Sequence, residues 1–372
     1  MKYSIIVPVY NRPDEVEELL ESLCQQTLKA ASQREQSDAH INSAEREQAR
    51  PKVKDFEVLI VEDGSQRDCK SVTERFIGRL DVKYFMKPNS GPGQSRNYGA
   101  ERANGEWLLI LDSDVVLPEG YLEAIDKSLS SASDEIVAFG GPDAANDSFT
   151  PVQKAISYSM TSFFTTGGIR GGKAKLDKFY PRSYNMGIRR DVYLQLGGFT
   201  KMRFGEDIDF SYRIVEAGYR PRLFPEAWVW HKRRTDFKKF FRQVYNSGIA
   251  RINLEKRHPG TMKLVHLLPT VFTVGVIALI LISAVGRALM HYVDRDQFYW
   301  MCFAPWIPII LYSLLICIDS TIKNRSLRVG ILSIPAAFVQ LMGYGLGFIE
   351  SWWKRCVLKQ DEFQAFEKTF YK

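Results

Sequence analysis

The chain has 372 residues, which is enough for one large domain and a further region. Lys and Arg number 50 against 43 Asp and Glu, a formal net charge of +7, and the first half has no basic block with interleaved aromatic residues, which argues against nucleic-acid binding. The five cysteines include no Cys-x-x-Cys pair, so neither a zinc site nor a disulfide framework is indicated, and free thiols fit a reducing compartment.

The first half of the chain alternates apolar strands with helices. Strands are predicted at residues 3–9, 56–61, 82–86 and 107–111. This alternation predicts an α/β fold with a mostly parallel, doubly wound sheet and flanking helices. The apolar run at the N-terminus is too short for a signal peptide, so we expect this part in the cytoplasm. Residues 28–54 are polar and read as a surface insertion.

Polar side chains follow three of these strands at the point where each one ends. They are Asn11 and Arg12, Glu62 and Asp63, and Asp112 and Asp114. Ligands bind to parallel sheets beyond the carboxyl ends of the strands, so this coincidence predicts a site there. Asp112 and Asp114 are two residues apart and would point to the same side of an extended backbone. Two such carboxylates suit Mg²⁺ or Mn²⁺ bridging a diphosphate, although an acidic turn after a strand is common.

Two later residues are candidates for chemistry. Asp207 begins a predicted helix, where the helix dipole favours a carboxylate, and is our candidate general base. The alternative is that Glu206 and Asp207 are only acidic residues of a first helical turn. His231 is a candidate metal ligand, although an isolated histidine is more often structural.

From residue 264 the composition becomes apolar. Three runs without a charged residue, 267–286, 298–318 and 329–349, are each long enough to span a bilayer core of about 30 Å. Trp300, Trp306, Trp352 and Trp353 are placed like interfacial anchors. We therefore expect about three transmembrane segments.

The orientation of this region is ambiguous in the sequence. Three spans from a cytoplasmic front would put the tail outside, yet Lys354, Arg355 and Lys359 favour the inside. The third run also contains Pro335 and several glycines, so it either spans or is re-entrant or broken.

Five motifs in a fixed order resemble a known family. They are Ile5-Ile-Val-Pro-Val-Tyr-Asn11, Val61-Glu-Asp-Gly-Ser65, Asn97-Tyr-Gly99, Leu111-Asp-Ser-Asp114 and Gly205-Glu-Asp-Ile-Asp209. Each motif is weak alone, but the ordered set resembles the glycosyltransferase family 2 enzymes with the GT-A fold over about residues 1 to 250.

The resemblance implies an inverting reaction, in which an acceptor hydroxyl attacks the anomeric carbon of a nucleotide-sugar and a nucleoside diphosphate leaves. It assigns the nucleotide pocket to Pro8, Tyr10, Asn11, Arg12, Glu62 and Asp63. It places Arg96 near the diphosphate or base and Asn185 beside the donor sugar or acceptor. Asp112 and Asp114 take the DxD role, with Asp114 favoured as the direct ligand of Mn²⁺ or Mg²⁺. Glu206 and Asp207 match the pair whose aspartate is the base, and His231 matches a position that sometimes contacts metal or phosphate.

One departure from the family concerns processivity. Polymer-making members carry Gln-x-x-Arg-Trp after the base, whereas residues 240–248 here read Phe-Phe-Arg-Gln-Val-Tyr-Asn-Ser-Gly. The absence of the motif favours transfer of a single sugar.

We therefore expect a catalytic domain at residues 1–260, a membrane region at 261–353 and a tail at 354–372. The expected protein is a multi-pass inner-membrane, metal-dependent hexosyltransferase with a cytoplasmic catalytic domain. It would act on a lipid-linked or membrane-proximal acceptor in surface glycan or polysaccharide synthesis. The alternatives are a polyprenyl-phosphate glycosyltransferase, a nucleotidyltransferase and a non-catalytic membrane-bound nucleotide-binding module. The nucleotidyltransferase ranks lowest, because the first strand is not followed by a glycine-rich basic loop.

Overall fold

The computed structural model describes residues 1–26, 56–132, 135–144, 149–167, 179–289, 302–363 and 365. The expected insertion at 28–54 lies outside these residues. The chain forms two compact units, one of Met1–Asn146 with Leu176–Lys232 and the other of Asp147–Lys175 with Arg233–Lys372. This division differs from the expected boundary near residue 260. The first unit contains all the candidate site residues, and the second contains the apolar helices.

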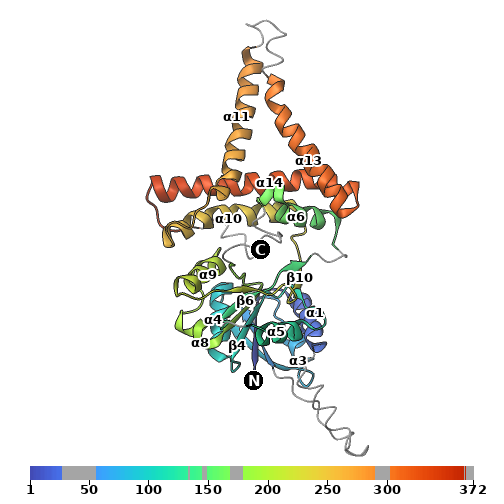
Figure 1. The fold of residues 1–372 in the computed structure, drawn as a ribbon, viewed down its shortest axis with the longest axis vertical. Helices are drawn as coiled ribbons and strands as arrows, with labels where there is room; N and C mark the ends of the chain where they lie inside the picture. Colours follow the sequence, from blue (N-terminus) through green and yellow to red (C-terminus); the bar gives the residue numbers. More distant parts are fainter. Residues whose placement is uncertain are drawn as a thin grey trace, which may run out of the picture. The chain divides into compact units, whose positions relative to one another are not determined.

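A seven-stranded sheet forms the centre of the first unit (Figure 1). Its strands are β1 (Tyr3–Val9), β2 (Phe56–Asp63), β3 (Asp81–Lys87), β4 (Trp107–Leu111), β6 (Ala138–Gly140), β8 (Asn185–Arg189) and β9 (Arg222–Leu223). They follow the order β3-β2-β1-β4-β8-β6-β9. The first four are parallel, whereas β8 is antiparallel to both β4 and β6. The expected mostly parallel sheet with flanking helices is confirmed.

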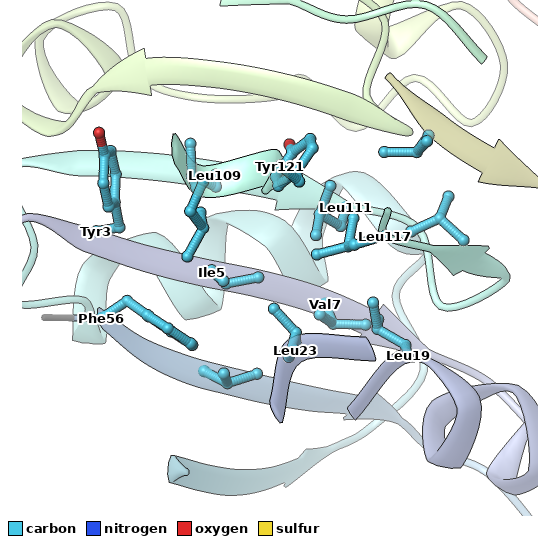
Figure 2. Close-up of a cluster of buried hydrophobic side chains, with 14 of the residues drawn as sticks. Tyr3, Ile5, Val7, Leu19, Leu23, Phe56, Leu109, Leu111, Leu117 and Tyr121 are labelled. Carbon is cyan, nitrogen blue, oxygen red and sulfur yellow. The ribbon is translucent and has the colours of Figure 1, made fainter. Parts of the chain in front are cut away.

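Helices cover both faces of this sheet because its strands are apolar on both sides. Successive side chains of a strand point to opposite faces. Ile5 and Val7 of β1 pack on the side of α1 (Pro13–Cys24), α3 (Lys70–Glu74) and α5 (Tyr121–Ser130), and Figure 2 shows part of this cluster. Ile6 packs on the other side. That side is covered by α4 (Pro92–Arg102), α8 (Arg190–Gln195) and α9 (Glu206–Glu216).

The strand order places the carboxyl ends of three strands next to one another. β1 lies between β2 and β4 and is parallel to both. After β1, the chain forms β2 and then β3 on one side of β1. It then crosses back, and β4 pairs with the other edge of β1. Such a reversal is where doubly wound sheets bind ligands. A second sheet, of β5 (Val115–Val116), β10 (Val229–His231) and β7 (Asp143–Ala144) in that order, begins just beyond the end of β4.

The second unit is helical. Its helices are α6 (Pro151–Thr161), α7 (Phe163–Thr166), α10 (Phe237–Arg257), α11 (Leu268–Leu289), α13 (Ile307–Asn324) and α14 (Leu327–Trp352), with short turns η1 (Leu264–His266), η2 (Ala304–Trp306) and η3 (Trp353–Val357). Three segments are long and apolar enough to cross a membrane, namely Leu264–Ala288, Ala304–Asn324 and Leu327–Val357. The start of the second expected run, at 298–301, lies outside the described residues. The third run is one continuous helix that contains Pro335, so it is not broken.

The contact between β8 and β6 yields a stability prediction. Gly187 lies opposite Phe139, and a Cβ added there would sit 2.0 Å from Cζ of that ring. The ring is held at 4.4 Å from the ring of Phe224 and 5.6 Å from that of Trp107. We therefore expect Gly187→Ala to destabilise the protein by about 1–3 kcal/mol, the usual cost of overpacking.

The measurement is the apparent melting temperature of the detergent-purified protein. Phe139→Leu removes part of the ring that obstructs the new methyl group, so Gly187→Ala should lower the melting temperature less in that background. An equal decrease in both backgrounds would contradict the proposed clash.

Candidate active site

Three potential metal ligands converge just beyond the end of β4. Ligand atoms of Asp112, Asp114 and His231 all lie within 4.8 Å of one another. Nε2 of His231 is 3.2 Å from a carboxylate oxygen of Asp114. Asp112 and Asp114 lie in a turn after β4, because the chain bends at Ser113 before β5. The expectation that an extended backbone aligns the two carboxylates was therefore wrong, although the turn still brings them together.

Strand pairing explains why a histidine over one hundred residues away reaches this turn. His231 of β10 pairs with Val115 of β5, the residue that follows Asp114. The backbone N–H of Lys232 donates to the carbonyl of Asp114 at 3.1 Å. The ring of Tyr184 stacks on the His231 ring with centroids 5.0 Å apart. The histidine is thus fixed by two backbone contacts and an aromatic neighbour.

Each aspartate of the pair contacts a different arginine. Arg12, which follows β1, forms an ion pair with Asp114. Arg96 of α4 donates to Asp112 at 2.7 Å, and its side chain is only 3% exposed. Buried carboxylates require such partners, because an unpaired buried charge is costly.

Arg96 also links this turn to the beginning of α9. Its other terminal nitrogen lies 3.1 Å from a carboxylate oxygen of Glu206. Asp207, the next residue, accepts from the backbone N–H of Ile208 at 2.8 Å and forms an ion pair with Nε of Arg182 at 2.8 Å. Gly205 precedes the helix with φ +84°, a conformation that glycine adopts without strain. The first turn of α9 is therefore held against the paired aspartates.

Two groups in the site have shifted pKa values. Burial and the neighbouring Asp207 carboxylate raise the pKa of Glu206 to about 7, despite the opposing charge of Arg96. Burial lowers the pKa of His231, but the carboxylates of Asp114 and Asp143 outweigh it and raise that pKa to about 9. Titratable groups whose pKa values are shifted by burial and by specific charged neighbours are typical of functional sites.

The polar residues after β1 and β2 organise the adjoining loops. Oδ1 of Asn11 accepts from the backbone N–H groups of Gln66 and Arg67 at 2.8 and 3.0 Å. Asp63 accepts from the backbone N–H groups of Ser90 and Gly91 at 2.9 and 2.8 Å, which anchors the glycine-rich turn before α4.

Several predicted pocket residues are engaged within the protein. Glu62 is fully buried and accepts from the backbone N–H of Cys69 at 2.9 Å. Asn185 is 1% exposed and donates to the carbonyl of Ala227 at 2.8 Å, while it accepts from Tyr121. Pro8 is buried within β1 opposite Val61. Tyr10 follows β1 directly and is partly exposed.

The structure adds residues that the sequence did not single out. They are Arg182 beside Asp207, Asp143 with its carboxylate 3.8 Å from Nδ1 of His231, and Tyr184 stacked on the His231 ring. Only Tyr184 had a sequence signal, because it immediately precedes the motif that begins at Asn185.

The donor set fits a divalent metal ion. Two carboxylates and one imidazole are ligands that Mn²⁺ accepts, and the carboxylates also suit Mg²⁺. Nδ1 of His231 is buried and has no hydrogen-bond partner among the described residues, and the carboxylate of Asp143 lies 3.8 Å from it. Asp114, Asp112 and His231 would hold the ion.

The fold and the site define an α/β protein with a cluster of two carboxylates and one imidazole just beyond the carboxyl end of β4, in a mostly parallel sheet. The chain matches the family described as Glycosyl transferase family 2 over residues 4–197, and Glycosyl transferase family group 2 over residues 107–317. The first match covers more than half of the chain, and the chain belongs to glycosyl transferase family 2.

Similar proteins include a pre-mycofactocin glycosyltransferase of Mycobacterium tuberculosis, 28% identical over 62% of this chain and 48% of its own length. The chain thus spans about half of that relative. Glycosyltransferase AglE of Haloferax volcanii is 26% identical over 68% of this chain and 73% of its own. Among solved structures, the mannosyltransferase PcManGT of Pyrobaculum calidifontis, in complex with GDP-Man and Mn²⁺, gives a TM-score of 0.53 at 15% identity, covering 95% of this chain and 88% of that one. This likeness shows a shared GT-A fold.

The ligand cluster predicts direct metal binding. Asp114 contributes to the cluster from a largely buried position, so Asp114→Ala should weaken binding of Mn²⁺ by about tenfold or more. Electron paramagnetic resonance of free Mn²⁺ measures this affinity without any substrate. Asp68→Ala, at an exposed carboxylate outside the cluster, is the control and should leave the affinity unchanged. Equal Mn²⁺ affinity in the Asp114→Ala variant and the unmodified protein would contradict the site.

Proposed function

We propose that the protein is a metal-dependent, inverting hexosyltransferase that moves a sugar from a nucleotide-sugar to a lipid-linked or membrane-proximal acceptor. Membership of glycosyl transferase family 2 supports sugar transfer from a nucleotide donor. The fold neighbour that holds GDP-Man and Mn²⁺ supports the donor class and the metal. The acceptor, the inversion and the metal dependence are our proposals.

The observation that carries the proposal is the bridge made by Arg96. Its guanidinium contacts Asp112 and Glu206, so the paired aspartates and the first turn of α9 face one site. A nucleotidyl binder would need the aspartate pair alone. A transferase also needs a base near the leaving group, and Asp207 lies next to Glu206 in this turn.

The proposed reaction exchanges one bond for another at the anomeric carbon. The acceptor oxygen forms the new bond, and the bond to the diphosphate breaks with its electron pair on the departing nucleoside diphosphate. The proton of the acceptor hydroxyl passes to the carboxylate of Asp207. Because attack comes from the side opposite the leaving group, the configuration inverts. A bound divalent ion would supply positive charge to the leaving diphosphate.

Other residues would position the donor. The loops held by Asn11 and Asp63 are candidates for the nucleoside, with Pro8 and Tyr10 at the end of β1. Glu62 and Asn185 are buried and would act by holding these loops and β8 in place. Arg12 is partly exposed beside Asp114 and would contact a diphosphate, whereas Arg96 is buried and would hold Asp112 and Glu206 in position near it. Arg182 would orient the base.

The apolar helices favour an acceptor at the membrane. A polyprenyl phosphate is the second candidate acceptor, because a phosphate oxygen would need no general base. The two candidates therefore differ in their dependence on Asp207. We also propose that the site faces the cytoplasm, where nucleotide-sugars and surface-glycan precursors meet.

Asp207→Asn should lower the transfer rate by about 10²–10⁴-fold, because the amide cannot accept the proton. Donor binding should persist, since the asparagine oxygen can still accept from Arg182. The measurement is release of nucleoside diphosphate from a panel of nucleotide-sugars, with membrane lipid extract as acceptor source, beside donor binding by calorimetry.

Asp191→Asn is the matched control, because Asp191 is an exposed first-turn acid of α8. It should keep normal activity. Loss of donor binding as large as the loss of transfer in Asp207→Asn would sink the assignment of the base. Full activity of Asp207→Asn on a polyprenyl phosphate would favour that acceptor. Donor binding without release on any acceptor would favour a non-catalytic module.

A further inference from the structure

Helix α14 has the composition of a membrane span but packs along a charged helix. The carbonyl of Ile249 on α10 accepts from the hydroxyl of Ser351, and Nε of Arg355 donates to Asn253 at 3.1 Å. Tyr245 lies against Gly347 in the same register, with its carbonyl 2.0 Å from the position of an added Cβ. In all three pairs the later residue, in α14 or in the η3 turn that follows it, lies 102 positions after its α10 partner, so the two segments run parallel over about two turns.

Small residues permit this close approach. A Cβ on Gly343 would meet Val244 of α10 at 2.5 Å, and one on Gly248 would meet the carbonyl of Tyr344 at 2.1 Å. Gly343 and Gly347 form the Gly-x-x-x-Gly spacing that lets helix backbones approach closely. Glycines on both helices therefore make this packing possible, and separating α14 from α10 would lose these contacts.

The partner helix α10 cannot lie in the hydrocarbon of a bilayer. Among the described residues it is not one of the segments apolar enough to cross. Arg242 and Arg251 lie within its length, and its two ends carry exposed Lys238, Lys239, Lys256 and Arg257. Each charged residue at the bilayer centre costs at least about 2.5–3.5 kcal/mol. The second half of α14 is fixed beside α10, and its first half packs against Ala155 of α6 through Val329 and Ala336. We therefore infer that α14 shares the position of α10 relative to the membrane.

The other two apolar helices rise from the opposite side of α14. Gly345 contacts Thr273 and Pro269 of α11, and it is turned by about 200° from Gly343 in a helix of 3.6 residues per turn. Gly330 contacts Thr321 of α13. These glycine contacts involve the first turns of α11 and the last turns of α13, and Tyr312 of α13 adds a ring contact with Phe338 of α14 at 6.4 Å. Figure 1 shows both helices leading away from α14. In the most apolar windows of α11 and α13 only 11% of residues are buried, against 44% in α14.

The C-terminal tail lies with α10. Arg257 forms an ion pair with Glu362 at 2.8 Å, and the backbone N–H of Ala365 donates to Oδ1 of Asn246 on α10 at 3.3 Å. α10 itself begins five residues after Lys232, the last residue of the unit that holds the candidate site. The tail and the start of α10 therefore belong on the same side of the membrane.

We propose that α14 lies in the membrane–water interface, with α10 on its aqueous side, and that α11 and α13 alone span the bilayer. Trp352 and Trp353, 48% and 52% exposed, then sit at headgroup level at the end of α14. Lys354, Arg355 and Lys359 face the anionic leaflet on the side of the candidate site. This arrangement removes the conflict between three spans and a basic tail. It does not depend on the proposed function.

Side-specific labelling tests the topology of the full-length chain. The five native cysteines are replaced by serine, and single cysteines are placed at exposed Glu74, at Asp296 and at exposed Gln360. Sealed membrane vesicles of both orientations are treated with a membrane-impermeant maleimide. We expect Gln360→Cys to label on the same side as Glu74→Cys and Asp296→Cys on the opposite side.

Two results would overturn the proposal. Labelling of Gln360→Cys with Asp296→Cys would mean three spans, and labelling of all three positions on one side would mean that the α11–α13 pair does not span. If the cysteine-free chain fails to fold, a peptide tag after Lys372 on the unmodified chain gives the same readout by protease digestion of the vesicles.

Depth measurement tests the position of α14 itself. A spin label at Met342, in the middle of α14, should report a shallow position by its accessibility to oxygen and a nickel chelate. The matched control is a label at Ile280, in the middle of α11 and 50% exposed, which should lie near the bilayer centre. Equal depths for the two labels would show that α14 spans.

Discussion

The candidate site depends on one buried cation. Arg96 is 3% exposed and neutralises Asp112 and Glu206, which come from β4 and α9. A buried charge is tolerated only with partners of opposite sign, so the Arg96 guanidinium requires these carboxyl groups. This requirement connects α4, the turn after β4 and the first turn of α9 around a common point. The pairing of β10 with β5 then adds His231 to the same place.

The packing of α10 against α14 in the second unit depends on close approach of the two helix backbones, whereas the candidate site depends on charge pairs. Gly248, Gly343 and Gly347 let α10 and α14 approach so closely that added Cβ atoms would overlap the partner backbone or side chains. Because α10 carries charged residues, this contact is the basis for our proposal of where α14 lies relative to a bilayer. The unit that holds the candidate site is connected in sequence to the unit that holds the apolar helices.

The sequence predicted the features that depend on residues close together in the chain, such as strands and their ends. β1 and β4 have the expected bounds, because continuous apolar runs ending at polar residues signal buried strands. The sequence named Asp112, Asp114 and His231 as candidate metal ligands, and the structure brings their ligand atoms within 4.8 Å of one another; their roles stay predictions. Arg182 was missed, since its contact with Asp207 depends on how a loop returns to α9. The length of the apolar run identified α14 as a helix but did not indicate how it lies relative to a membrane. Hydropathy contains no information that Gly343 and Gly347 face another helix.

The metal dependence of nucleoside diphosphate binding most directly tests our proposal that the turn after β4 would bind a divalent ion together with a diphosphate. The measurement is calorimetric titration of UDP and GDP into the detergent-purified chain, first with Mn²⁺ and then after EDTA. The account predicts that binding of at least one nucleotide requires Mn²⁺ and returns when the ion is restored. Equal affinity with and without the ion would contradict it.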